Sequence, residues 1–510
     1  MKRIGALLLC TALLLSGCGV GGDDPYVPTG DALFQEDAPV TDQTQVTKEA
    51  LSIPYYPQKS LNPFECSDPN NKALLSLVYQ GLFALDQDHG TWPILCQSYQ
   101  VSWDLKTYTF TLADATFSDG DPVTAEDVVA SLKAAKKGSV YKGRFSNVDK
   151  ISATDEGAVE ISLKIPCESF LMLLDVPIVK KSQVEDKIPL GTGPYVFVSG
   201  DQPSLKRRSS WWCTGSVPVT AEEIKLQKAG TPAELRDAFE FSNLSMVTTD
   251  PGSDAYADFH SDYELWESEN GIFVYLVCNK DSKVLTNSDL RSELLQAINR
   301  ESIVAEYYRG FATQTVLPVS PNFPYYPAAL ANQYSYQPMR LIQAVEEYRD
   351  TAAKEAILLV NGEDGIRLRV ANRIAQDLND CGMKVKVNAL PTKEYIKALE
   401  EGEFDLYLGQ TRLSSNMDLS AFFAPDGALS YGGLSDPAIY SLCLEALANS
   451  GNYYNLYQKI LEKGLLCPIL FRSYAIYTRR GSFRGLTPAR DNLFFYHLGR
   501  TMEDALIVED

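Results

Sequence analysis

Two adjacent stretches, Trp103-Asp-Leu-Lys-Thr-Tyr-Thr-Phe-Thr-Leu112 and Phe117-Ser-Asp-Gly-Asp-Pro-Val-Thr-Ala-Glu-Asp-Val128, carry most of the information about the fold. In the first, large apolar residues and threonines alternate from Tyr108 to Leu112, which predicts a half-buried strand. In the second, Thr124 precedes a helical pattern over 125–135, and Asp127 stands three residues later as in a capping box. The two stretches predict a strand, a turn and a capped helix.

Outward from these stretches, the pattern remains that of a mixed α/β chain. We expect further strands at 51–55, 158–165, 271–279, 357–360, 383–389, 404–408 and 468–477. We expect helices at 72–82, 168–174, 231–239, 289–298 (after the cap Ser288), 366–378 and 393–401. The alternation of strands and helices between 357 and 408 predicts a partly parallel sheet.

Composition excludes several classes of function. The chain has 510 residues, 45% of them hydrophobic, and 66 acidic residues against 46 basic ones give a formal net charge of −20. Such an acidic balance argues against nucleic acid as a partner, because nucleic-acid binders gather Lys and Arg against phosphate. Only three histidines occur, at 89, 260 and 497, and they lie far apart, which argues against histidine-rich zinc catalysis and leaves few possible bases for a Ser-His-Asp triad. We expect no metal site, and we expect no cofactor.

The N-terminus indicates export. Residues 1–18 read MKRIGALLLCTALLLSGC, with two basic residues, a short apolar run and a final cysteine. The run is too short to span a bilayer and suits a signal peptide over 1–17. Its end resembles the lipobox of bacterial lipoproteins, which implies lipidation of Cys18 and a place on the outer face of the cytoplasmic membrane. Residues 18–47 then form the lipidated cysteine and a flexible linker.

Eight further cysteines stand at widely spaced positions from Cys66 to Cys467. An even number in an exported protein is compatible with disulfides. Buried thiols are the competing interpretation, and the sequence leaves both open.

Several short motifs occur in a fixed order along the chain. They are Leu61-Asn-Pro-Phe64, Val78-Tyr-Gln-Gly-Leu-Phe83, the two stretches quoted above, Gly191-Thr-Gly-Pro-Tyr195, Asn299-Arg-Glu301 and Gly485-Leu-Thr-Pro488. This ordered set, from about residue 50 to 500, resembles the family 5 extracellular solute-binding proteins of ABC transporters, the peptide- and nickel-binding type.

The resemblance implies a two-lobed periplasmic-binding-protein-like fold of type II, with an extra subdomain in the first lobe. Lobe I would comprise 48–65, 186–273 and 478–510, the subdomain 66–185, and lobe II 274–477, with crossover strands near 272–280 and 468–477. A ligand would bind between lobes that close on it, as clefts between domains favour.

The resemblance also implies which residues touch the ligand. They are Cys66, Ser67, Asp68, Tyr141, Arg144, Phe273, Tyr275, Gln410, Arg412, Ser414, Ser415, Asn416 and Asp418. Peptide binders of the family carry an Asp for the peptide's α-ammonium in the loop that here reads Arg412-Leu-Ser-Ser-Asn-Met-Asp418. Asn416 stands near that position, so the α-ammonium contact is absent or passes to Asp418.

The expected function is that of a substrate-binding lipoprotein of an ABC importer, a monomer that delivers an oligopeptide or similar small solute to permease subunits. Peptide is the leading solute by family resemblance, and nickel chelates and other small solutes remain open. The alternatives are a surface receptor for a peptide signal without import, and a surface hydrolase. The hydrolase is disfavoured because neither G-x-S-x-G nor S-x-x-K occurs in a fitting context, so we expect no enzymatic activity.

Overall fold

The computed structural model describes residues 51–213, 219–256 and 258–507. The expected signal peptide, the lipidated Cys18 and the linker lie outside these ranges. Within them, no helix combines the length and apolarity that crossing a membrane requires.

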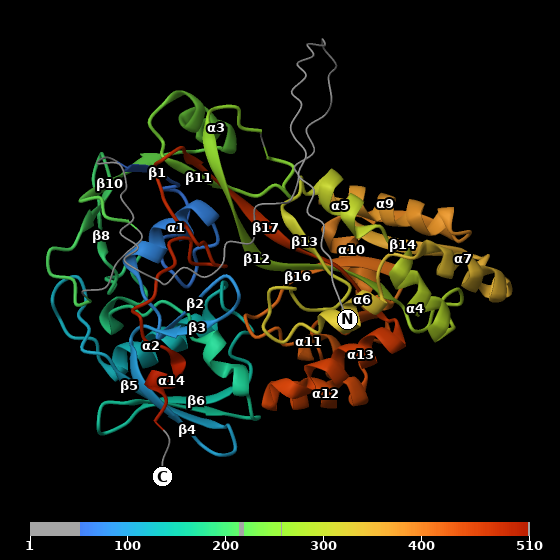
Figure 1. The fold of residues 1–510 in the computed structure, drawn as a ribbon, viewed down its shortest axis with the longest axis horizontal. Helices are drawn as coiled ribbons and strands as arrows, with labels where there is room; N and C mark the ends of the chain where they lie inside the picture. Colours follow the sequence, from blue (N-terminus) through green and yellow to red (C-terminus); the bar gives the residue numbers. More distant parts are fainter. Residues whose placement is uncertain (1–50, 214–218, 257, 508–510) are drawn as a thin grey trace, which may run out of the picture. The chain divides into compact units, whose positions relative to one another are not determined.

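The first part of the molecule is built on a four-stranded sheet of order β1-β10-β9-β8 (Figure 1). Its strands are β1 (Leu51–Tyr55), β10 (Glu223–Lys228), β9 (Ser204–Arg207) and β8 (Tyr195–Val198). β1 pairs with β10 in parallel although most of the first part lies between them in sequence. The chain between β1 and β8 therefore leaves this sheet and returns to it.

That excursion forms a second four-stranded sheet of order β4-β5-β7-β6. Its strands are β4 (Cys96–Val101), β5 (Thr107–Leu112), β7 (Val159–Leu163) and β6 (Val148–Ala153), and the helix α2 (Ala125–Lys137) packs on it. The Thr124 hydroxyl accepts a hydrogen bond from the Asp127 amide and the Asp127 carboxylate accepts one from the Thr124 amide, so the predicted capping box is present.

The second part is built on a seven-stranded sheet with the path β11-β17-β12-β16-β14-β15 and β13 paired to β17. Its strands are β11 (Met246–Thr249), β12 (Tyr263–Cys278), β13 (Ala312–Gln314), β14 (Glu355–Asn361), β15 (Lys384–Leu390), β16 (Leu406–Arg412) and β17 (Leu466–Arg479). β14 pairs in parallel with β15 and β16, so the predicted partly parallel sheet is confirmed.

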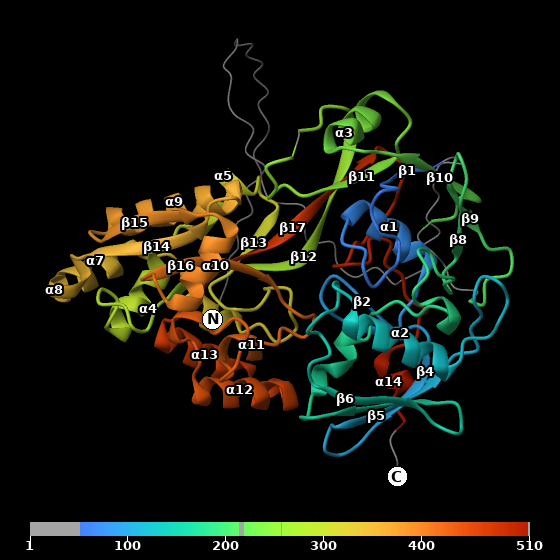
Figure 2. The same cartoon turned by 180° about the vertical axis from the view of Figure 1, so that it is seen from behind.

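The remaining elements surround these sheets (Figures 1 and 2). They are α1 (Pro69–Val78), β2 (Phe83–Leu85), β3 (Thr91–Pro93), α3 (Pro232–Phe241), α4 (Ser288–Ala297), α5 (Arg300–Tyr307), α6 (Ala328–Gln333), α7 (Pro338–Glu347), α8 (Arg349–Ala352), α9 (Gly365–Asp380), α10 (Thr392–Glu401), α11 (Ser420–Phe423), α12 (Pro437–Ala448), α13 (Tyr453–Lys463), α14 (Met502–Ala505) and the 3₁₀ turns η1 (Glu168–Leu173), η2 (Lys181–Gln183), η3 (Tyr431–Gly433) and η4 (Ser450–Asn452).

β12 and β17 connect two separate hydrophobic cores. They run side by side for most of their length (Figure 2). The second half of β12, from Phe273 to Cys278, and the first half of β17 belong to one core, whereas Ile476 near the end of β17 belongs to the other. Pairing of β12 with β17 is interrupted between Glu269 and Phe273, where Gly271 has a φ of 73°. Two cores joined by two long strands confirm the predicted two-lobed α/β class, while the domain boundaries stay predictions.

Several local predictions need correction. α1 begins at Pro69 rather than at 72, because the Asp68 carboxylate caps the helix by accepting from the amides of Asn70 and Asn71. α4 is capped by Asn287, so the expectation that Ser288 is the cap was wrong. The helix expected at 168–174 is the 3₁₀ turn η1.

The cysteines from Cys66 to Cys467 form no disulfide in the described part of the chain. Seven of them are buried and Cys213 is half-buried. The sequence left open disulfides and buried thiols, and these eight cysteines are thiols in the structure.

Candidate functional site

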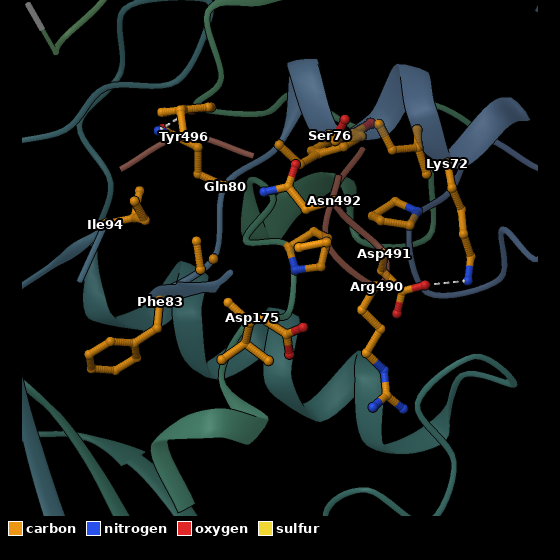
Figure 3. Close-up of a pocket in the computed structure, with 18 of the residues that line it drawn as sticks. Lys72, Ser76, Gln80, Phe83, Ile94, Asp175, Arg490, Asp491, Asn492 and Tyr496 are labelled. Carbon is orange, nitrogen blue, oxygen red and sulfur yellow. Dashed lines mark hydrogen bonds and ion pairs between the residues drawn. The ribbon is translucent and has the colours of Figure 1, made fainter. Parts of the chain in front are cut away.

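A pocket lies in the first lobe between α1, β2 and the chain from Ala489 to Tyr496 (Figure 3). Its empty volume is about 800 Å³ including the solvent at its opening. Leu75, Phe83 and Ile94 contribute apolar walls, and a group of polar side chains converges on the same space. This combination of apolar walls with a few placed polar groups is typical of small-molecule sites.

Among the polar side chains of the pocket, Asp491 and Lys72 carry opposite charges and bind each other. Asp491 Oδ1 accepts hydrogen bonds from Lys72 Nζ at 2.8 Å and from Arg412 Nη2 at 2.6 Å (Figure 3 shows the contact with Lys72). Burial by itself would raise the pKa of Asp491, but Arg412, Lys72 and Arg490 outweigh it and hold this pKa well below its ordinary value. Asp491 is therefore a carboxylate at neutral pH.

This ion cluster joins the two lobes. Lys72 lies on α1 and Asp491 on the C-terminal segment, both in the first lobe, whereas Arg412 ends β16 in the second. The Nε of Arg412 also donates to the carbonyl oxygen of Asn270 at 3.0 Å, beside the interruption in β12. The cluster thus meets the connecting strands where they pass from one core to the other.

Further contacts between the lobes lie nearby. His89 Nδ1 lies 3.2 Å from the carbonyl oxygen of Ser415, and Asn416 Nδ2 lies 3.8 Å from Cys167 Sγ. The Ser450 amide donates to a carboxylate oxygen of Glu168 at 2.8 Å. Burial lowers the pKa of His89 to about 4, so its imidazole is neutral at pH 7 where it contacts the Ser415 carbonyl.

A second cavity, with an empty volume of about 300 Å³, shares charged lining residues with the first. It is lined by Lys72, Arg490 and Asp491 again and by Ser268 and Tyr474 of the connecting strands. The charged residues therefore line two cavities, one of which reaches the strands that join the lobes.

Of the predicted contact residues, Cys66 and Tyr141 line the larger pocket. Burial raises the pKa of the Cys66 thiol to about 12, so it is uncharged and unreactive at pH 7. The Tyr141 ring lies under the Arg144 guanidinium, 4.9 Å from ring centroid to Cζ, and Arg144 is paired with Asp175, which also lines the pocket.

Other predicted residues have different surroundings. Ser67 is exposed, and Asp68 caps α1 and pairs with Lys59 at 2.5 Å. Phe273 and Tyr275 are buried in the second core, where their rings stack with centroids 5.3 Å apart. The structure does not bring these residues to the pocket, and their contact with a ligand stays a prediction.

The second-lobe loop is bound mainly to its own lobe. The side-chain oxygen of Gln410 accepts from Arg472 at 3.2 Å, Ser414 donates to the side chain of Asn416 at 2.7 Å, and Asp418 accepts from the Ser420 amide at 2.8 Å. Burial raises the pKa of Asp418 above its ordinary value, and no cation pairs with it among the described residues. Arg412 is the member of this loop that reaches the first lobe through a charge.

Further residues that line the pocket were not predicted from the sequence: Lys72, Gln80, Asp175, Arg490, Asp491, Asn492 and Tyr496. The last four follow the Gly485-Leu-Thr-Pro488 turn on an irregular segment. No periodicity marks them, and the turn that precedes them was the available signal. The described residues hold no cluster of three or more potential metal ligands.

Comparison with known proteins places the chain in a family. The model of the bacterial extracellular solute-binding proteins, family 5, matches residues 92–428, which is more than half of the chain. The glutathione-binding protein GsiB of Salmonella typhi is 26% identical over 356 residues, covering 65% of this chain and 67% of that protein.

Solved structures agree on the fold. The ABC transporter substrate-binding protein CtaP of Listeria monocytogenes superposes with a TM-score of 0.71 at 18% identity, covering 88% of this chain and 98% of that one. A nickel ABC transporter protein of Bacillus halodurans gives a TM-score of 0.72 at 19% identity, covering 88% and 99%. With a family model that matches more than half of its length and with matching folds, this chain belongs to the family 5 bacterial extracellular solute-binding proteins.

Proposed function

We propose that this protein captures a small organic solute at the junction of its lobes and delivers it to the permease of an ABC importer, without chemical change. The observation that carries the proposal is the pocket of Figure 3, because its apolar walls and converging polar groups end at the ion cluster that joins the lobes. A ligand held there would contact Lys72 and Asp491, and Asp491 is bound in turn by Arg412 of the second lobe. Such a ligand favours the closed population, which is the signal that a permease can read.

An oligopeptide is the leading candidate solute. The relative GsiB, 67% of whose length matches this chain, is named for binding glutathione, which is a tripeptide. Lipidation at Cys18 would hold the protein at the outer face of the membrane, where exchange with a permease does not require free diffusion. We expect a monomer, since one chain contains both lobes and both connecting strands.

The test is capture from defined pools. The full chain is incubated with a peptide pool of two to five residues, with glutathione and with nickel–histidine, and complexes are read by native mass spectrometry. We expect a peptide or glutathione to be retained and the radius of gyration from X-ray scattering to fall on binding. Retention of none of the three, with unchanged scattering, would contradict solute capture of this kind.

Import is tested separately in cells. Deleting the gene should abolish uptake of the retained solute, labelled with an isotope, and the wild-type gene should restore it. Normal uptake in the deletion strain, with a changed transcriptional response to the same solute, would instead favour a surface receptor.

A further inference from the structure

One cation of the pocket, Arg490, has no carboxylate within ion-pair distance among the described residues. Arg490 donates through Nη2 to the carbonyl oxygen of Leu413, and it forms no ion pair with a carboxylate in the described part of the chain. Its Nε and Nη1 atoms are buried and have no hydrogen-bond partner there. Buried guanidinium groups ordinarily have partners for their donors, so this side chain is an exception that calls for a cause.

The surroundings of Arg490 increase the imbalance. Arg144 is paired with Asp175, and Lys72 and Arg412 are both paired with Asp491. With Arg490 this makes four cations against two carboxylates, so the cluster carries an excess of two positive charges in a chain with a net charge of −20. The imbalance is local and opposite in sign to the protein as a whole.

Two other titratable groups face Arg490, and neither compensates it well. His89 is neutral at pH 7, as described above, and lies on the side of Ser415. Glu269 accepts a hydrogen bond from the Ser320 hydroxyl at 2.6 Å, and burial raises its pKa to about 7, so it is only partly ionised at neutral pH. Neither His89 nor Glu269 therefore supplies a full negative charge to Arg490 at pH 7, and Asp491 and Asp175 are each already paired with another cation.

The position of Arg490 suits contact with a ligand. Its side chain lines both cavities and extends away from the Asp491–Lys72 pair (Figure 3). The guanidinium carbon lies 2.8 Å from where a Cβ on Gly271 would stand, so it packs directly on the interruption in β12. The Leu413 carbonyl that it binds belongs to the second lobe. One side chain therefore meets the pocket, the connecting strand and the facing lobe.

We propose that Arg490 binds a carboxylate of the captured solute, so that the protein selects anionic solutes whose apolar part lies in the pocket beside Phe83 and Ile94. The inference rests on the proposed function and adds the chemical class of the solute. Charge-assisted hydrogen bonds between guanidinium and carboxylate are stronger than neutral ones, and a ligand carboxylate would supply the missing partner. Burial, then Arg412 and Arg144, lowers the pKa of Arg490 to about 9, which is the effect that a bound anion would reverse.

The experiment compares one peptide pool in two chemical forms. Peptides of two to five residues are offered to the full chain with free carboxyl groups or after methyl esterification of every carboxyl group, with native mass spectrometry as readout. Arg490→Gln is compared with Arg484→Gln, an exposed residue of the same segment that removes the same charge. The affinity for a retained acid peptide, and for its ester, is then measured by calorimetry for each variant.

We expect the wild-type chain and Arg484→Gln to retain acid peptides and to bind the matched esters about 10- to 100-fold more weakly. Arg490→Gln should bind acid and ester with the same low affinity. Its melting temperature without ligand should equal or exceed that of the wild type, because a cation with two buried, unpartnered donors and no ion pair has been removed.

Equal binding of acids and esters by the wild-type chain would overturn the inference and leave solute capture intact. An Arg490→Gln variant that keeps the acid preference would overturn it as well. A lower melting temperature with equal loss of acid and ester binding would show that Arg490 holds the lobes together instead. Absence of any retained peptide in either form would overturn both this inference and the proposed capture of peptides.

Discussion

Asp491 Oδ1 accepts hydrogen bonds from Arg412 Nη2 at 2.6 Å and from Lys72 Nζ at 2.8 Å, so one carboxylate oxygen joins the end of β16 to α1. The three side chains are largely buried, with 17%, 28% and 14% of their surface exposed for Asp491, Arg412 and Lys72. A carboxylate in this position neutralises cations from two lobes at once. Its removal should affect stability more than the loss of an ordinary surface ion pair.

Replacing Asp491 with Asn tests this relationship. The substitution keeps the shape and leaves Arg412, Lys72 and Arg490 without a negative charge, so the free energy of unfolding should fall by about 3 kcal/mol. Urea denaturation at pH 7 measures the change. Asp426→Asn, at an exposed position, should change stability by less than about 0.5 kcal/mol. Equal stability of the two variants would contradict the role assigned to Asp491.

Glu269 should make the protein less stable as pH rises. Its pKa is about 7 in the folded state against an ordinary value of 4.5, with burial as the main cause. Both states bind the proton below pH 4.5, so Glu269 has no effect there. Between pH 4.5 and 7 the unfolded chain releases the proton first, and stability is lost. Glu269→Gln should therefore raise the free energy of unfolding at pH 7.5 by roughly 1–3 kcal/mol and leave it unchanged at pH 4.

Denaturation curves of the wild type and Glu269→Gln at a series of pH values measure this effect. Glu223→Gln, at an exposed position of β10, serves as the control and should follow the wild type throughout. A constant difference between Glu269→Gln and the wild type from pH 4 to 8 would show that the titration of Glu269 is not its source.

His89 should act in the opposite direction. Burial lowers its pKa to about 4 from an ordinary value of 6.5. The unfolded chain takes up a proton at pH 6.5 and the folded one only near pH 4, so stability is lost as pH falls through this window. His89→Asn should remove that loss, and Asn tolerates the φ of 62° at this position.

The two variants separate effects that overlap in the wild type. Between pH 4.5 and 6.5, the contribution of Glu269 to the free energy of unfolding falls as pH rises, whereas that of His89 increases. Glu269→Gln should lose stability on acidification in this range, and His89→Asn should gain it. Identical slopes in both variants would contradict one or both assignments.

The thiols offer a chemical test of the fold. With Cys10 and Cys18 replaced by serine, eight cysteines remain, and none forms a disulfide in the described part of the chain. We expect Ellman's reagent to titrate all eight in denaturant, but only Cys213 rapidly in the native state, because the other seven are buried. Cys213→Ser should abolish the rapid native reaction. Fewer than eight thiols in denaturant would reveal a disulfide.

Much of the fold was predictable because local chemistry determines it. The alternation from Tyr108 to Leu112 became β5, and Thr124 with Asp127 caps α2 as expected. The order of strands and helices from 357 to 408 gave the partly parallel sheet. The predicted cap of α4 failed because two adjacent residues, Asn287 and Ser288, are both good caps and the backbone selects one.

The candidate site was only partly predictable. Cys66 and Tyr141 were expected beside the ligand and do line the pocket, whereas Phe273 and Tyr275 belong to the second core. A buried strand presents alternate residues to opposite faces, and its sequence does not say which face meets a cleft when both faces are apolar.

The sequence by itself determined the elements and the family, because caps, alternation and ordered motifs act over a few neighbouring residues. Only the tertiary structure decided the charges of the site. It brought Lys72 of α1, Arg412 of β16 and Asp491 of the C-terminal segment to one point, and it left Arg490 beside them with two buried donors that have no partner among the described residues. The strength of an electrostatic interaction depends on the distance between the charges and on their burial. For residues hundreds of positions apart, the sequence gives neither quantity.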